Sequence, residues 1–234
     1  MTFPQFSEQL EARVAKYDLL CHPFYKAWAA GELTREELRA YAADYYPQVA
    51  AFPEYLGKLA SRTVDGGLRG ALLINRADEL GSEDPDGRAH EELWLDFAEG
   101  MGAQREQVRG HTPIPEVQDL IATFHRVAGE GSVAEALAAF YAYESQVPRV
   151  AREKARGLRE MYGADASTCG YFTLHQTADL HHARVWTQQL ERELTANPEA
   201  AAEALDAAEA AAGALWRALD GIERQRLERR AAAA

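Results

Sequence analysis

The stretch His175-Gln176-Thr177-Ala178-Asp179-Leu180-His181-His182 carries three side chains of metal-binding type at a helical spacing. Positions 175, 179 and 182 are related as i, i+4 and i+7, so a helix would place them on one face while His181 points elsewhere. Two imidazoles and a carboxylate suit iron or manganese. Because a buried histidine is usually a hydrogen-bonded core residue, the stretch alone leaves a metal site and an ordinary core helix equally open.

Two more carboxylates and one more histidine extend this pattern. A closed dinuclear centre needs carboxylates that balance the charge of its cations, and helical bundles supply them from facing helices. Glu144 lies in an apolar and aromatic run, residues 139–148, where an unpaired carboxylate would be costly. Glu79 ends another partly apolar run, and His90 opens the next predicted helix. Spacing alone does not single these two out from their acidic neighbours.

Two capping boxes mark the starts of long helices. Thr34 and Glu37 predict a helix that runs towards Arg62 and is interrupted and bent by Pro47 and Pro53. Ser132 and Glu135 predict a second helix, through 161–162 to a stop at Gly163. Pro148 lies inside it and should kink it beside Glu144, whose carbonyl group it leaves without a partner.

The remaining chain reads as helices joined by short connections. Further helices are predicted over 4–20, 67–81, 88–101, 115–129, 171–195 and from 198 almost to the end, with loops at 63–67, 81–88 and 110–115. We therefore predict an all-α, single-domain bundle of about seven to eight helices over residues 1–234. The alanine-rich segment 198–234 fits a closing helix, a dimer-contact helix or a partly frayed end, so a homodimer stays open.

Composition excludes several classes of function. The 234 residues are 47% hydrophobic and 26% charged, which is ordinary for a globular protein. With 37 acidic against 25 basic side chains the net charge is -12, so we expect no nucleic-acid partner and no binding to anionic membranes. No apolar run approaches a membrane span, and none follows Met1, so we expect a cytoplasmic protein. We interpret Cys21 and Cys169 as reduced packing residues.

Together these residues resemble the haem-oxygenase-like dimetal oxidases, in particular the branch that includes the Chlamydia protein associating with death domains. The resemblance covers nearly the whole chain and is carried by 75–81 with His90 and Trp94, by 143–148, and by 175–182. It implies a haem-oxygenase-like fold. It also implies a complete set of six metal ligands, namely Glu79, His90, Glu144, His175, Asp179 and His182.

The same resemblance implies a function. Members of this branch are implicated in making p-aminobenzoate for folate synthesis by consuming one of their own tyrosines once, with a lysine as the source of the amino group. The matching positions are Tyr25, Tyr41 and Lys154. The implied cofactors are two iron ions or a mixed iron/manganese pair, with dioxygen and an external reductant. Zinc is disfavoured because it has no redox chemistry.

Other interpretations compete with this one. A tyrosine on an apolar helix face is usually a core residue, and a lysine among alternating charges, as Lys154 is, is usually solvated. The chain could be a multiple-turnover dimetal oxidase acting on an external fatty acid, amino acid or other small substrate. It could also be a metal-free enzyme like the thiaminases or the pyrroloquinoline-quinone-forming enzymes, or a protein that only binds a partner.

Overall fold

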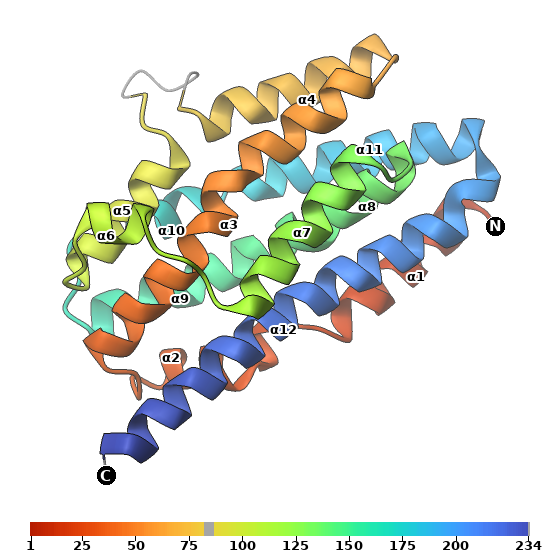
Figure 1. The fold of residues 1–234 in the computed structure, drawn as a ribbon. Helices are drawn as coiled ribbons and strands as arrows, with labels where there is room; N and C mark the ends of the chain where they lie inside the picture. Colours follow the sequence, from red (N-terminus) through yellow and green to blue (C-terminus); the bar gives the residue numbers. More distant parts are fainter. Residues whose placement is uncertain (82–86, 234) are drawn as a thin grey trace.

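The computed structural model describes residues 1–81 and 87–233, and over these ranges the chain forms helices and no strand (Figure 1). The α-helices are α1 (Phe3–Ala15), α2 (Pro23–Ala29), α3 (Arg35–Arg62), α4 (Gly66–Glu79), α5 (His90–Gly100), α6 (Arg105–Arg109), α7 (Pro115–Gly129), α8 (Val133–Glu144), α9 (Val147–Met161), α10 (Gly170–His175), α11 (Ala178–Ala196) and α12 (Ala201–Ala233). Short 3-10 helices, η1 (Leu19–Cys21) and η2 (Pro198–Ala200), precede α2 and α12. The all-α class is confirmed. The loop predicted at 81–88 falls largely on 82–86, outside the described residues.

Both predicted capping boxes are present. The Thr34 hydroxyl accepts a hydrogen bond from the Glu37 amide at 3.1 Å, and the Glu37 carboxylate accepts one from the Thr34 amide at 2.7 Å. Ser132 and Glu135 pair in the same way at the start of α8. The predicted interruption of α3 is wrong, because the helix continues through both of its prolines to Arg62. Packing of its long buried face outweighs the two missing hydrogen bonds.

Two predicted long helices are instead broken, which raises the helix count above the predicted seven to eight. The helix predicted over 132–162 ends at Glu144 and restarts as α9 at Val147. Pro148 lies in the first turn of α9, where its missing amide costs nothing, and its ring excludes a helical bond to the Glu144 carbonyl. The helix predicted over 171–195 is likewise broken, at residues 176–177. The expectation that 175, 179 and 182 share one continuous helix is therefore wrong.

The structure also tests the predictions for the N-terminal helix, the two cysteines and the alanine-rich C-terminal segment. The predicted helix over 4–20 stops at Ala15, and Cys21 at the end of η1 is exposed, so only Cys169 is a packing residue. Helix α12 runs along α7, α8 and α1, and its buried alanines allow close approach (Figure 1). Near its end Arg230 pairs with Glu37 at 2.6 Å. The alanine-rich segment is thus a closing helix.

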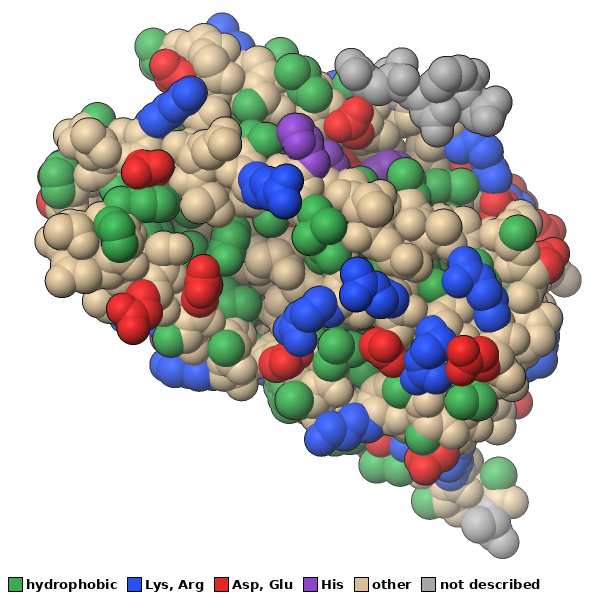
Figure 2. All heavy atoms as spheres, turned by 180° about the vertical axis from the view of Figure 1, so that it is seen from behind, with side chains coloured by type: hydrophobic (Ala, Val, Ile, Leu, Met, Phe, Trp, Pro, Cys, Tyr) green, Lys and Arg blue, Asp and Glu red, His purple; other side chains and the backbone are tan. Residues whose placement is uncertain are grey.

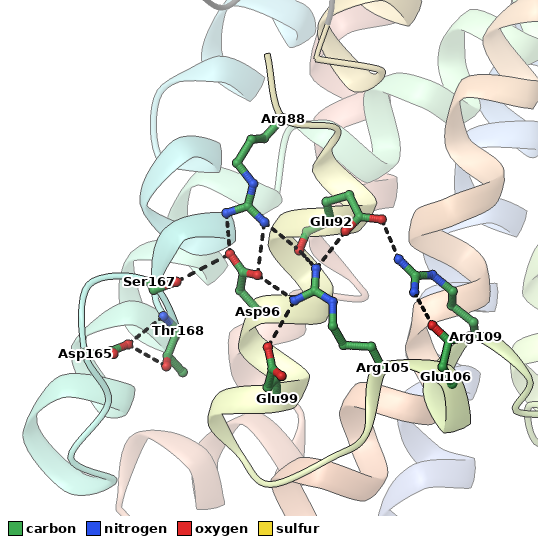
Figure 3. A network of polar contacts seen from close by, with 10 residues as sticks. All are labelled: Arg88, Glu92, Asp96, Glu99, Arg105, Glu106, Arg109, Asp165, Ser167 and Thr168. Carbon is green, nitrogen blue, oxygen red and sulfur yellow. Dashed lines mark hydrogen bonds and ion pairs between the residues drawn. The ribbon is translucent and has the colours of Figure 1, made fainter. Parts of the chain in front are cut away.

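A network of ions fixes the outer side of α5. Asp96 accepts hydrogen bonds from Arg88 at 2.5 Å and from Arg105 of α6 at 2.8 Å, and Arg105 also pairs with Glu92 (Figure 3). Because Arg88 lies two residues before His90, the network holds the start of α5 in place. Within the described ranges, no helix combines the length and apolarity that crossing a bilayer requires.

Candidate metal site

The six predicted ligands are supplied by five helices, and most of them sit at helix ends. Glu79, Glu144 and His175 are the last residues of α4, α8 and α10, His90 is the first residue of α5, and Asp179 and His182 lie in the first two turns of α11. All six side chains are buried. The helix ends therefore converge on one point in the interior, where the sequence pattern had predicted a site.

Ligand atoms in this cluster are close enough to share metal ions. Glu79, His90 and His175 offer one set of atoms within 4.8 Å of one another, and Glu79, Glu144 and His182 offer a second set. Glu79 belongs to both sets, so it could help to hold an ion in either. Asp179 belongs to neither set, but its Oδ1 lies 3.4 Å from His182 Nδ1.

Unpaired polar atoms test whether the cluster fits metal ions. Among the described residues, His90 Nδ1, His182 Nδ1 and Asp179 Oδ2 are buried and lack a partner in hydrogen-bond geometry, although His90 Nδ1 lies only 2.8 Å from Glu79 Oε2. Each buried polar atom left unpaired costs about 1–3 kcal/mol. Three such atoms in one cluster of carboxylates and imidazoles are explained together if cations occupy the space between them. The residues therefore fit the implied metal ions.

Charge inside the cluster is balanced by protons when no cation is bound. Burial by itself would raise the pKa of Glu79, but His90 and then His175 and His182 outweigh it and lower that pKa. Burial raises the pKa of Glu144. Burial opposes charge on His182, yet Asp179 and Glu144 raise the pKa of that imidazole. Metal ions would replace these protons as the positive charge in the pocket.

Several residues hold the ligands in orientation, and sequence reasoning did not single them out. The indole of Trp186 donates a hydrogen bond to Glu144 Oε2, and Asn75 donates to the other oxygen of that carboxylate at 3.4 Å. His175 Nδ1 donates to the Tyr171 carbonyl at 2.7 Å, which leaves Nε2 available to a metal ion. A signal for two of them was present, since Trp186 is four residues after a ligand and Asn75 four residues before one.

A second buried cluster joins the other three predicted residues. Lys154 Nζ donates hydrogen bonds to the hydroxyls of Tyr25 at 2.7 Å and Tyr41 at 2.5 Å. The lysine is only 6% exposed, so the solvated alternative is wrong. Burial lowers the pKa of Lys154 well below its usual range and raises the pKa values of both phenols. Burial is the cause of the lowered pKa of Lys154, and no carboxylate among the described residues offsets it. Burial therefore disfavours both the ammonium form of Lys154 and the phenolate forms of Tyr25 and Tyr41.

Aromatic side chains connect the two clusters. The Tyr171 ring stacks on the His175 imidazole with centroids 4.0 Å apart, and Trp94 lies 4.9 Å from Tyr171 and 5.7 Å from Tyr41. Tyr143 and Tyr171 line two small voids, one beside Lys154 and one beside the carboxylates. The amine, the phenols and the carboxylate–histidine cluster thus lie in one buried region.

The fold and the site define a helical protein with a buried carboxylate–histidine cluster next to a lysine–tyrosine cluster. Residues 39–216 match the family of iron-containing redox enzymes, and the chain belongs to that family. It is therefore an oxidoreductase, as the resemblance implied.

Similar proteins agree with this membership. The chain is 42% identical over 183 residues to the protein named 4-aminobenzoate synthase from Chlamydia trachomatis, with 78% of each chain covered. A protein of the same name from Nitrosomonas europaea is 37% identical over 227 residues, covering 93% of this chain and 90% of the relative. A solved structure from Shewanella denitrificans, described as having a heme oxygenase-like fold, has a TM-score of 0.80 at 17% identity and covers 97% of this chain and 94% of its own. The predicted haem-oxygenase-like fold is confirmed.

Proposed function

We propose that this chain is a self-sacrificing 4-aminobenzoate synthase that makes one product from its own side chains. In this proposal Glu79, His90, Glu144, His175, Asp179 and His182 hold two iron ions or an iron/manganese pair. The observation that carries the proposal is the buried Lys154 amine, held at 2.7 Å from the Tyr25 hydroxyl in the buried region that also contains the ligand cluster. The relatives that share this name support it over most of the chain.

The metal pair, when bound, supplies together with dioxygen and an external reductant the oxidising power needed to attack a phenol. The chain's own residues supply the rest. Tyr25 provides the ring, Lys154 provides the nitrogen as an uncharged amine, and Tyr41 holds the amine by a second hydrogen bond. The hydrogen bond from Lys154 Nζ to the Tyr25 hydroxyl keeps the amine beside the ring that it would aminate.

The protein around the cluster excludes water. Tyr25, Trp94, Phe172 and Tyr171 close the void beside the amine, and Tyr41 is fully buried. In such an environment a reactive phenol is protected from hydrolysis and from loss of its oxidised form to solvent. An external reductant, a cytoplasmic location, a homodimer and the lack of a nucleic-acid partner stay predictions.

The test starts from purified chain loaded with iron and manganese in the absence of oxygen. Exposure to oxygen and a reductant should give about one 4-aminobenzoate per chain, with mass lost at Tyr25, which supplies the carbon atoms, and at Lys154, which supplies the nitrogen. Nitrogen-15 from labelled lysine should appear in the product, and Lys154→Met should abolish it. Lys26→Met, at an exposed lysine of α2, is the matched control and should change neither yield nor label.

Two outcomes would replace the proposal. Many products per chain with an unchanged peptide mass would indicate a multiple-turnover oxidase that acts on an external substrate. A chain that binds neither metal and still acts on a small molecule would indicate a metal-free enzyme of the pyrroloquinoline-quinone-forming type.

A further inference from the structure

A cavity of about 750 Å³ connects solvent with the ligand cluster. It lies between the end of α4, α5, α9, α10 and α11, and His90 and His182 form part of its inner wall. Figure 2 shows this side of the molecule, where histidine side chains reach the surface beside an acidic side chain, with apolar and basic side chains nearby. A cavity of this size is in the range of small-molecule sites, about 300–1,000 Å³.

The wall of the cavity is mostly apolar, with a few polar groups at its rim. Leu93 and Leu174 supply the larger apolar surfaces, and Arg159, Thr173 and His181 supply polar groups. Small-molecule sites typically have this composition, an apolar wall for the body of the ligand and few polar groups that fix its orientation.

Arg159 brings positive charge that has no acidic partner in the described part of the chain. Its guanidinium donates to the Thr173 hydroxyl at 2.8 Å. Arg149 and Arg156 of the same helix each pair with carboxylates, at 3.1 Å and 2.9 Å, and Arg88 at the opposite rim pairs with Asp96. Among the described residues that line this cavity, Arg159 is therefore the guanidinium without a carboxylate partner.

Negative charge in the wall lies on its inner side. Asp78 lines the cavity, and its Oδ2 lies 3.4 Å from His182 Nε2. That carboxylate would repel an anion from the inner wall, whereas Arg159 would attract one at the rim. A ligand with one anionic end is therefore expected to bind with that end towards Arg159.

We propose that this cavity binds a small aromatic carboxylate of the benzoate class. Its carboxylate lies on the planar guanidinium of Arg159, and its ring lies between Leu93 and Leu174. The proposal rests on the proposed function in one respect, because the acid that such a synthase releases has this chemistry. A benzoate taken up from solution would be bound in the same way.

Calorimetry on the full chain, kept free of oxygen, measures binding of 4-aminobenzoate, benzoate and aniline. The two acids should bind, and aniline, which lacks the carboxylate, should bind at least about tenfold more weakly. Arg159→Gln should weaken binding of the acids by a similar factor. Arg152→Gln, on the exposed side of the same helix and outside the cavity, should leave it unchanged.

Gly170 offers a second variant that does not remove charge. It lines the cavity, and a Cβ there would approach only Leu93, at 3.7 Å, so Gly170→Leu should fill the cavity without a clash at that atom. Binding of the acids should be lost. Equal affinity for aniline and benzoate, or acid binding that survives both Arg159→Gln and Gly170→Leu, would overturn the proposal.

A final experiment shows whether the bound acid is the protein's own product or comes from solution. It also tests this proposal separately from the proposed function. Chain that carries ring-labelled tyrosine is turned over once, and the acid retained on the protein is identified by mass spectrometry. Labelled acid retained by the unaltered chain and released faster by Arg159→Gln identifies the product as the ligand. Calorimetry needs no turnover, so benzoate binding without any labelled acid would support the cavity and count against the synthase.

Discussion

Replacing Lys154 by methionine should change how the stability of the protein depends on pH. Methionine keeps most of the volume of lysine and cannot titrate. In the folded chain burial holds the pKa of Lys154 well below its usual range, whereas the unfolded chain restores a value of about 10.4. Between these two pKa values the unfolded state binds one more proton than the folded state, so the unfolding free energy of the unaltered protein rises with pH.

The size of this effect follows from linkage. Inside that window the unfolding free energy of the unaltered chain should rise relative to Lys154→Met by about 1.4 kcal/mol per pH unit, or about 2.7 kcal/mol over two units. The two hydrogen bonds lost with Lys154, worth about 1–3 kcal/mol together, add an offset that does not depend on pH. At neutral pH, removing the buried amine stabilises Lys154→Met, and the two missing hydrogen bonds destabilise it. At higher pH only the destabilisation from the missing hydrogen bonds remains.

Urea unfolding of both proteins at several values between pH 7 and 9.5 measures this slope. Lys26→Met, an exposed lysine on the helix that carries Tyr25, should show no pH-dependent difference from the unaltered chain. A difference between the unaltered chain and Lys154→Met that stays flat with pH would refute the reasoning. It would mean that the amine stays charged when buried, and a charged ammonium has no lone pair with which to form a carbon–nitrogen bond.

Three other perturbations test separate parts of the structure. Trp186→Phe removes the hydrogen bond to Glu144 and should weaken metal binding roughly tenfold or more in a competition titration, with little change in the fold. Gly157→Ala would bring a Cβ within 2.9 Å of the buried Trp28 ring, so it should lower the free energy of unfolding measured in urea by about 1–3 kcal/mol. Its control is Gly70→Ala, where a Cβ would meet no neighbouring side chain within 4 Å, and this variant should raise the free energy of unfolding by about 0.5–1 kcal/mol. Adding manganese at about a hundred times its dissociation constant should stabilise the folded chain by about 2.7 kcal/mol, and a chelator should remove this stabilisation. A melting temperature that manganese leaves unchanged would count against the metal site.

Local signals predicted the parts of the fold that depend on local chemistry. The capping boxes at Thr34 and Ser132 involve residues three positions apart, and both helices begin where these boxes predict. Gly163, with φ +65°, ends α9 as predicted because the left-handed conformation there suits glycine. Where tertiary packing competes with local preference, prediction failed, as at Pro47 and Pro53, whose helix continues because it is buried on one side.

In the candidate site, too, local sequence signals predicted some residues, and the contacts that depend on tertiary packing were missed. His175, Asp179 and His182 could be found because their chemical type and spacing are visible in one stretch of chain, and the apolar surroundings of Glu144 are visible in another. The family resemblance was needed to select Glu79 and His90. The burial of Lys154 could not be found in this way, because its neighbours Tyr25 and Tyr41 come from α2 and α3, far away in sequence. Only the family resemblance selected that lysine from its charged neighbours.

The break between α10 and α11 gives a physical reason why the ligand spacing works. On a continuous helix, residues 175 and 182 would be about 10.5 Å apart along the axis, whereas the two ions of a dinuclear site are about 3.5–4 Å apart. In the structure His175 joins one set of ligand atoms and His182 the other, and Glu79 belongs to both. Ending α10 at His175 and restarting at Ala178 frees the two histidines from a common helical register. Each histidine lies beside a carboxylate from the end of a different helix, Glu79 for His175 and Glu144 for His182, so the helix ends that sequence reasoning missed are the places where the candidate ligands gather.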